Sequence, residues 1–116
     1  MSTELPMLIS SENSESSSQI NFEIGKDLKF FDGHFPGKPI VPGYILLSWA
    51  LRYAKQNLGL SYKSFKANSV KFLRMVTPGL KLALNLKFEL SSSKLSFSYT
   101  SEDGEDIFCS GILILE

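Results

Sequence analysis

The chain has 116 residues, enough for one compact domain, and its 12 Lys and Arg residues balance its 12 Asp and Glu residues. A formal net charge of zero with no basic run argues against a nucleic-acid partner, and it leaves little repulsion to oppose self-association. The single cysteine excludes an internal disulfide bond and metal-ligand spacing is absent, so we expect a cytoplasmic protein without a metal or cofactor.

The amino-terminal part of the chain predicts a β-hairpin. Met1–Ile9 lacks the basic start and long apolar core of a signal peptide, and Leu5–Ile9 fits a short first strand. Ser10–Ser18 is polar and low in complexity, so we interpret it as a mobile hairpin loop inside one domain. Gln19–Ile24 then alternates between apolar and polar residues, which indicates a half-buried strand.

The stretch from Phe30 to Gly43 is dense in glycine and proline and carries the only histidine, His34. Proline fixes φ and glycine supplies backbone angles that other residues avoid, so such a run disfavours regular structure. An imidazole titrates near neutral pH, which suits a general base. We therefore predict an active-site loop around His34; a structural histidine that bonds the loop backbone is the alternative.

One helix is predicted after this loop, beginning near Pro42 and running to about Leu58, with Gly59 as its carboxyl-terminal cap. Tyr44–Leu51 is apolar nearly all round, which is typical of a helix enclosed by other structure, and it is too short to span a bilayer. Ser48 is the exception. It opens a polar stripe on one helix face that continues through Arg52, Lys55 and Gln56.

After the helix, the hydrophobic period changes to two, which predicts strands. The predicted strands are Lys66–Val76, Lys81–Leu90, Lys94–Thr100 and Ile107–Leu115. In the second of these we expect Leu90 to face inward and Ala83 outward, and we interpret Cys109 in the last as a small buried hydrophobe. One helix followed by consecutive antiparallel strands predicts an α+β domain over residues 1–116, with a curved sheet wrapped around one long buried helix.

Three segments carry a resemblance to a known family. Gly33–Gly43, which reads GHFPGKPIVPG, resembles the signature of the bacterial β-hydroxyacyl-acyl-carrier-protein dehydratases, which have the hot-dog fold. Leu47–Ala54 is similar to the part of the small aryl-polyene-pathway (ApeI-like) dehydratases that carries an acid-Trp-Ala motif. Lys71–Arg74, followed by Pro78 and Gly79, resembles the KFxxxxxPG segment of the family.

The resemblance implies a single hot-dog domain and a homodimer whose two sheets join edge to edge. It implies an active site at the dimer interface, built from the histidine of one subunit and a helix acid of the other. The substrate would be a 3-hydroxyacyl chain on the phosphopantetheine arm of an acyl carrier protein, and the products a trans-2-enoyl thioester and water. The pathway would be fatty-acid or aryl-polyene biosynthesis.

The resemblance also assigns roles to residues. His34 would act as the base, and the N–H of Gly43 would bind the thioester carbonyl, as helix amino termini favour developing negative charge. A tunnel for the acyl chain would be lined by the substrate-binding residues Phe31, Phe35, Pro42 and Leu47.

The sequence departs from the family at the position of the helix acid, which is Ser48 here. Val41–Gly59 contains no carboxylate, and a hydroxyl with a very high pKa is no equivalent acid; such a loss typically slows a reaction 10²–10⁴-fold. Ser48 would then bond the substrate hydroxyl or hold a proton-relaying water, or be a purely structural residue. The missing acid suggests one alternative, a non-catalytic acyl-binding or heterodimer partner subunit. A second alternative is a hot-dog thioesterase, although the absent helix acid counts against it too.

Overall fold

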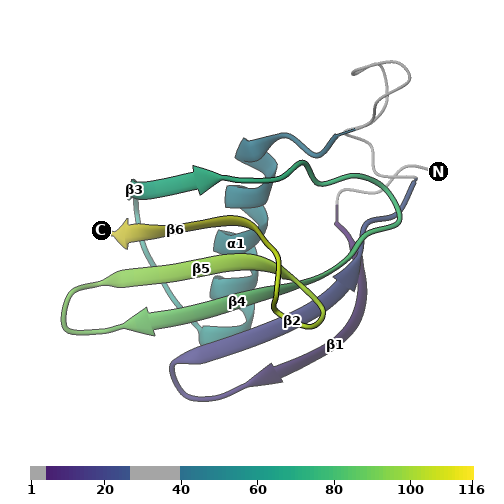
Figure 1. Cartoon of the computed structure of the whole chain (residues 1–116). Helices are drawn as coiled ribbons and strands as arrows, with labels where there is room; N and C mark the ends of the chain where they lie inside the picture. The colour runs from purple at the N-terminus through teal and green to yellow at the C-terminus, as the bar shows by residue number, and fades with distance from the viewer. Residues whose placement is uncertain (1–4, 27–39) are drawn as a thin grey trace.

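The computed structural model describes residues 5–26 and 40–116. Within them one six-stranded sheet packs against one helix, α1 (Gly43–Leu58), which confirms the predicted α+β class (Figure 1). Every neighbouring pair of strands is antiparallel, in the order β1-β2-β4-β5-β6-β3, so β1 and β3 form the two edges. The strands are β1 (Met7–Asn13), β2 (Ser17–Glu23), β3 (Phe65–Phe72), β4 (Lys81–Glu89), β5 (Lys94–Ser101) and β6 (Ile107–Leu115).

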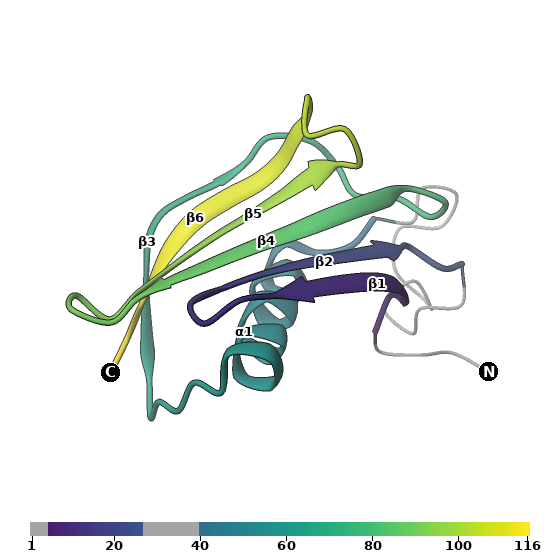
Figure 2. The same ribbon diagram turned by 90° about the horizontal axis from the view of Figure 1, so that it is seen from below.

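The helix lies across the concave face of the curved sheet (Figures 1 and 2). Its amino end follows Pro42, which is extended (φ −61°, ψ 149°), and its carboxyl end is capped by Gly59 in the left-handed region (φ 66°). Glycine adopts that region without a Cβ clash, so it ends the helix at low cost. Both predicted helix ends are confirmed.

One face of α1 packs on the sheet and the other faces outward. The buried helix residues are Ile45, Leu46, Trp49, Ala50, Leu51, Tyr53 and Ala54. On the outward face Tyr44 is 66% exposed, and Ser48 and Arg52 are also exposed. The predicted polar stripe is therefore confirmed. Within this chain alone, the large side chain of Tyr44 in the first turn of α1 is largely exposed.

Tyr99 on β5 joins the sheet to the middle of the helix. Its ring contacts Phe22 and Phe97 edge-on, with centroids 6.1 and 6.3 Å away, and its hydroxyl donates a hydrogen bond of 2.5 Å to the Leu46 carbonyl oxygen. Burial raises the pKa of Tyr99 well above its ordinary value. The predicted inward faces of β2 and β5 are confirmed, and so is the buried Cys109.

The prediction for the polar segment Ser10–Ser18 is wrong in extent. Ser10–Asn13 belongs to β1 and Ser17 begins β2, so only residues 14–16 connect the two strands of the predicted hairpin. Every residue of β1 is exposed, so polar side chains can occupy it without being desolvated. The Ser18 hydroxyl also donates to Oδ1 of Asn13, and this hydrogen bond joins the two strands where they meet the turn.

Three details at other strands also differ from the prediction. The strand β3 ends at Phe72 and not at Val76, because the N–H groups of Leu73 and Arg74 both turn to the Phe108 carbonyl oxygen. Leu90 is 83% exposed in the turn after β4, where the alternation ends. Ala83 is buried although it was expected outward; it lies between Asn21 and Thr100 on neighbouring strands.

Candidate active site

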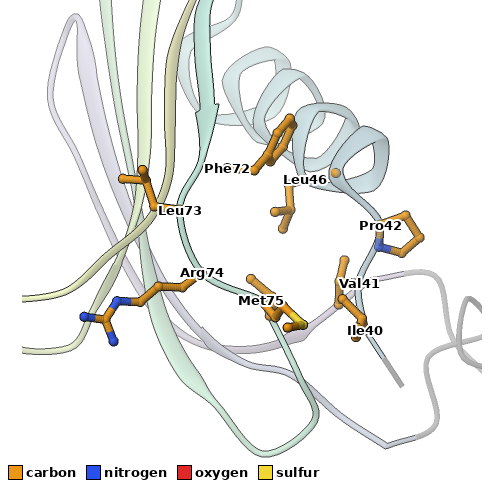
Figure 3. Close-up of a pocket in the computed structure, with 10 residues that line it drawn as sticks. Ile40, Val41, Pro42, Leu46, Phe72, Leu73, Arg74 and Met75 are labelled. Carbon is orange, nitrogen blue, oxygen red and sulfur yellow. The ribbon is translucent and has the colours of Figure 1, made fainter. Parts of the chain in front are cut away.

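A cleft of about 450 Å³ opens between the start of α1 and the chain that leaves β3 (Figure 3). Its lining residues are Ile40, Val41, Pro42, Gly43, Leu46, Phe72, Leu73, Arg74, Met75 and Val76. A hydrogen bond of 2.8 Å from the Val41 N–H to the Val76 carbonyl oxygen holds the two walls together. The lining is mostly apolar, so the cleft suits an acyl chain better than a charged ligand.

The amino end of α1 forms one wall of this cleft. The N–H groups of Ile45 and Leu46 bond the Pro42 carbonyl oxygen, at 3.0 and 3.3 Å, and the helix has no side-chain cap. Among the described residues, none accepts a hydrogen bond from the Gly43 N–H. Helix amino termini leave such N–H groups free and carry a partial positive charge, so this group can bind an oxygen that gains negative charge.

Phe72 forms the opposite wall and lies directly against Gly43. A Cβ added at Gly43 would meet two carbons of the Phe72 ring at 2.8 Å, closer than real Cβ contacts. Gly43 is therefore required for this close approach, in addition to any role of its N–H. Figure 3 shows the ring directed at the first turn of α1.

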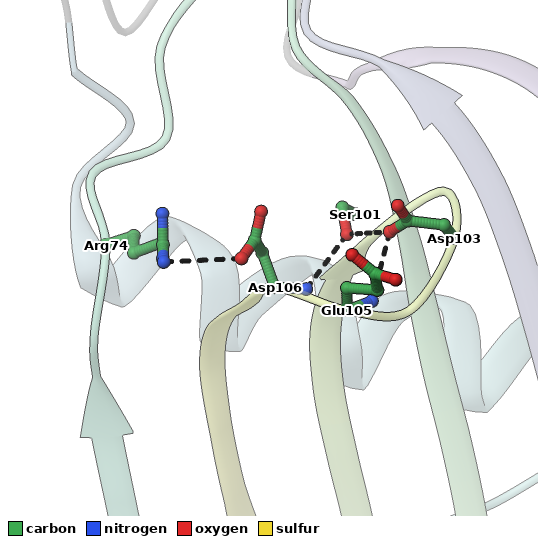
Figure 4. A network of polar contacts seen from close by, with 5 residues as sticks. All are labelled: Arg74, Ser101, Asp103, Glu105 and Asp106. Atoms are coloured by element: carbon green, nitrogen blue, oxygen red, sulfur yellow. Dashed lines mark hydrogen bonds and ion pairs between the residues drawn. The ribbon is translucent and has the colours of Figure 1, made fainter.

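Among the described lining residues, Arg74 is the one that is charged, and its side chain points away from the cleft (Figure 3). Its guanidinium pairs with Asp106 at 3.3 Å (Figure 4). The Asp106 N–H donates to the Ser101 hydroxyl, which in turn donates to Asp103. The Ser101 hydroxyl and the Glu105 N–H lower the pKa of Asp103. This polar turn holds the Arg74 charge outside the cleft, so the described part of the lining presents no charge to it.

The predicted site residues separate into three groups. Gly43 and Pro42 line the cleft, whereas Leu47 is half-buried against the core and does not. Ser48 is exposed and lies about 160° around the helix from Leu46, which lines the cleft. The structure therefore does not bring Ser48 to the cleft of its own chain. The predicted residues outside the described ones are His34, Phe31 and Phe35.

Eight lining residues were not predicted as site residues: Ile40, Val41, Leu46, Phe72, Leu73, Arg74, Met75 and Val76. The signal for Phe72 was its place in the family-like segment from Lys71 to Gly79, which had been given no role in the site. Among the described residues, no three His, Cys, Asp or Glu side chains gather as metal ligands would. Within the same residues, no helix is long and apolar enough to cross a membrane.

Comparisons with known proteins agree with this geometry. The ApeI-like family model, described as ApeI dehydratase, matches residues 10–112. The chain belongs to this family. A structure described as the dehydratase heterocomplex ApeI:P from Xenorhabdus doucetiae superimposes with a TM-score of 0.84 and 29% identity, over 96% of this chain and 97% of that one. The hot-dog fold expected from the sequence is thereby confirmed.

Curated relatives extend the likeness to a second group of dehydratases. The 3-hydroxyacyl-[acyl-carrier-protein] dehydratase FabZ of Oenococcus oeni is 32% identical over 84% of this chain and 76% of its own. FabZ of Blochmanniella floridana is 36% identical over 60% of this chain, which spans 58% of that relative. A hypothetical thioesterase from Streptococcus pneumoniae, at 10% identity and a TM-score of 0.64, shares the fold alone.

Proposed function

We propose that this chain forms a dehydratase that converts a 3-hydroxyacyl thioester on an acyl carrier protein to the trans-2-enoyl thioester and water. The observation that carries the proposal is the Gly43 N–H at the amino end of α1, beside a cleft of about 450 Å³ whose described lining is mostly apolar. Membership of the ApeI-like family and the similarity to FabZ proteins support the same reaction class.

In the proposed reaction the Gly43 N–H donates a hydrogen bond to the thioester carbonyl oxygen. That bond stabilises the negative charge which develops there when His34 removes a proton from C2. The C2 electron pair then forms the C2–C3 double bond while the C3–O bond breaks. The proton that His34 took from C2 passes from its imidazolium, directly or through a water, to the hydroxyl, which leaves as water. Ile40, Val41 and Met75 would contact the acyl chain.

The proton for the leaving hydroxyl does not come from Ser48 of the same chain in this proposal. Ser48 lies on the far side of α1 from the cleft, so its hydroxyl would serve the cleft of a second subunit. The edge strand β3 and the exposed side chains beside it offer the surface for that subunit: Tyr44, Leu73 and Met75. We propose a homodimer in which the two sheets join along β3.

Turnover of a 3-hydroxyacyl carrier thioester, followed by enoyl absorbance, tests this function. We expect turnover in the wild type, and we expect His34→Ala to lower it about 10²–10⁴-fold because the base is lost. Wild-type turnover no higher than that of His34→Ala would contradict the proposal. Release of free thiol in the same assay would indicate the thioesterase alternative.

A partner subunit is the second candidate function, and a specific observation favours it. Val41–Gly59 contains no carboxylate, and the similar structure from Xenorhabdus doucetiae is described as a heterocomplex. In a heterodimer, the cleft of this chain would receive its acid from the other subunit. Ser48→Glu restores an acid at the family position, and Ser48→Gln is its uncharged control. Activity in Ser48→Glu with none in the wild type or Ser48→Gln favours this candidate; equal turnover in all three excludes it.

A further inference from the structure

A β-bulge in β3 decides which side chain faces the amino end of α1. Asn68 pairs with Ile112 and Lys71 pairs with Ser110, so Ser69 and Val70 together oppose the single residue Gly111. Ser69 has a left-handed backbone, with φ of 57°. Such bulges re-aim the side chains that follow them.

The bulge reverses the facing of the residues after it. Phe65 pairs with Leu115 and Phe72 pairs with Cys109, and both partners are buried on the helix side of the sheet. Positions seven residues apart in a regular strand face opposite sides, because side chains alternate. With the extra residue, Phe72 faces α1 and Lys71 faces outward, opposite Ser110. Without it, a lysine would point at Gly43.

Gly111 makes the bulge possible. A Cβ at this position would lie 2.8 Å from Cγ2 of Val70 and 3.0 Å from its Cα, which is backbone and cannot move aside cheaply. Gly111 in β6 therefore leaves room for the bulge at Ser69. The bulge in turn places the ring of Phe72 against Gly43.

We infer that Phe72 determines substrate specificity, because its ring against Gly43 excludes 3-hydroxyacyl thioesters that carry a methyl branch at C2. The inference rests on the proposed function. A carbonyl oxygen bound by the Gly43 N–H places C2 within about 6 Å of that nitrogen. The Phe72 ring already occupies contact distance to Gly43. An unbranched chain passes the ring, whereas a C2 methyl directed toward it collides.

The test compares binding of two unreactive amide analogues of acyl-pantetheine, the 3-hydroxybutyryl and the 2-methyl-3-hydroxybutyryl compound, by calorimetry. One methyl in an apolar site changes affinity by about 10–200-fold, so we expect the wild type to prefer the unbranched analogue at least tenfold. We expect Phe72→Ala to bring the ratio of the two dissociation constants close to one, and Phe72→Leu to give an intermediate ratio. Because Phe72 is 55% exposed, neither change removes core packing.

Phe65→Ala is the matched control. Phe65 lies on the same strand and faces the same side as Phe72, yet it does not line the cleft. We expect it to keep the wild-type ratio, which separates a local effect of Phe72 from a general effect of losing an aromatic residue on this edge. An unchanged ratio in Phe72→Ala, or an equal fall in Phe65→Ala, overturns the inference.

Binding and turnover also separate the two proposals. A wild type that discriminates between the analogues but turns over no 3-hydroxyacyl thioester supports the role of Phe72 and contradicts the dehydratase function. A wild type that turns over the unbranched substrate but binds both analogues equally supports the dehydratase function and contradicts the role of Phe72. A wild type that binds neither analogue overturns both.

Discussion

The two edges of the sheet differ in how each strand is held and in what lies beside it. At one edge, β1 pairs with β2 through a short connection, and polar side chains reinforce the pair, with Asn21 donating to Ser10 at 3.1 Å. At the other edge, β3 pairs with β6 from the far end of the chain, and its end borders the cleft. Each edge carries exposed apolar residues and a bulge.

The two faces of β3 differ sharply. Lys66 and Lys71 pair with Ile114 and Ser110, so both lysines lie on the outer face. Phe65 and Phe72 are on the helix side of β3, and no residue of β3 on that side is charged. The carboxyl half of β1, in contrast, consists of Ser10–Asn13 and is polar on both faces. The polar half of β1 makes β3 the better candidate for the edge at which the proposed homodimer joins.

The largest expected effect is on subunit association. Leu73, just after β3, is 56% exposed, and Leu8 in β1 is 60% exposed, so the two give matched substitutions at opposite edges. A charge buried at an interface without a partner costs about 3 kcal/mol or more. We therefore expect Leu73→Asp to raise the dimer dissociation constant about 100-fold and Leu8→Asp to leave it unchanged, as measured by analytical ultracentrifugation. The opposite result would place the interface at β1.

The next effect is on stability and concerns the bulge of β3. In Gly111→Ala the new methyl meets the Val70 backbone at 3.0 Å, so we expect unfolding to become easier by roughly 1–3 kcal/mol. Ser110→Ala, one residue away and only half-buried, should change the free energy of unfolding by less than about 0.5 kcal/mol. Urea denaturation measures both. Similar stability of the two variants would mean that the bulge can relax.

The sequence predicted those elements whose signals are local. Pro42 and Gly59 marked the helix ends, and alternation marked β4 and β5, because one face of each strand packs on the core. The predicted first strand, Leu5–Ile9, overlaps the apolar half of β1. Alternation could not reveal the polar half, Ser10–Asn13, since a strand exposed on both faces needs no apolar side. It also could not reveal the bulge at Ser69, where the left-handed residue is a serine and not the glycine that usually signals one.

The predicted residues that line the cleft, Pro42 and Gly43, lie at the start of the helix, whereas the opposite wall depends on distant pairing. Gly43 and Pro42 lie at the cleft as expected, because both are fixed by the first helical turn. The wall opposite them depends on the register of β3 against β6, about 40 residues further along the chain, which no local pattern encodes. The outward direction of Ser48 follows from helix geometry alone, at about 100° per residue.

High pH should weaken the β3 edge before the β1 edge. Burial raises the pKa of Cys109, which lies opposite Phe72, from 9.0 to about 11. The folded state favours the neutral thiol, so this contribution to stability is complete below pH 9.0 and is lost as the pH rises toward 11. We expect amide exchange to accelerate in β3 earlier in this window than in β1.

Cys109→Ala is the control for the alkaline effect. It removes the thiol, so the free energy of unfolding should fall less steeply between pH 9 and 11 than in the wild type. The slope should not vanish, because the pKa of Tyr99 is raised in the same direction by burial. An identical slope in Cys109→Ala and the wild type would show that the thiol does not couple to folding.

The smallest expected effect has opposite signs at the two edges. Ser69 in β3 has a φ of 57°, which costs a non-glycine residue about 1–2 kcal/mol, whereas glycine adopts this region freely. Glycine also gives the unfolded chain about 0.4–1 kcal/mol of extra conformational freedom, so Ser69→Gly should stabilise the protein by only about 0.5 kcal/mol. Ser10 in β1 has no positive φ, and Ser10→Gly should therefore destabilise the protein by about 0.5–1 kcal/mol. If thermal unfolding showed the same sign for both variants, the serine in the bulge would be relaxed by contacts that its dihedral angle does not reveal.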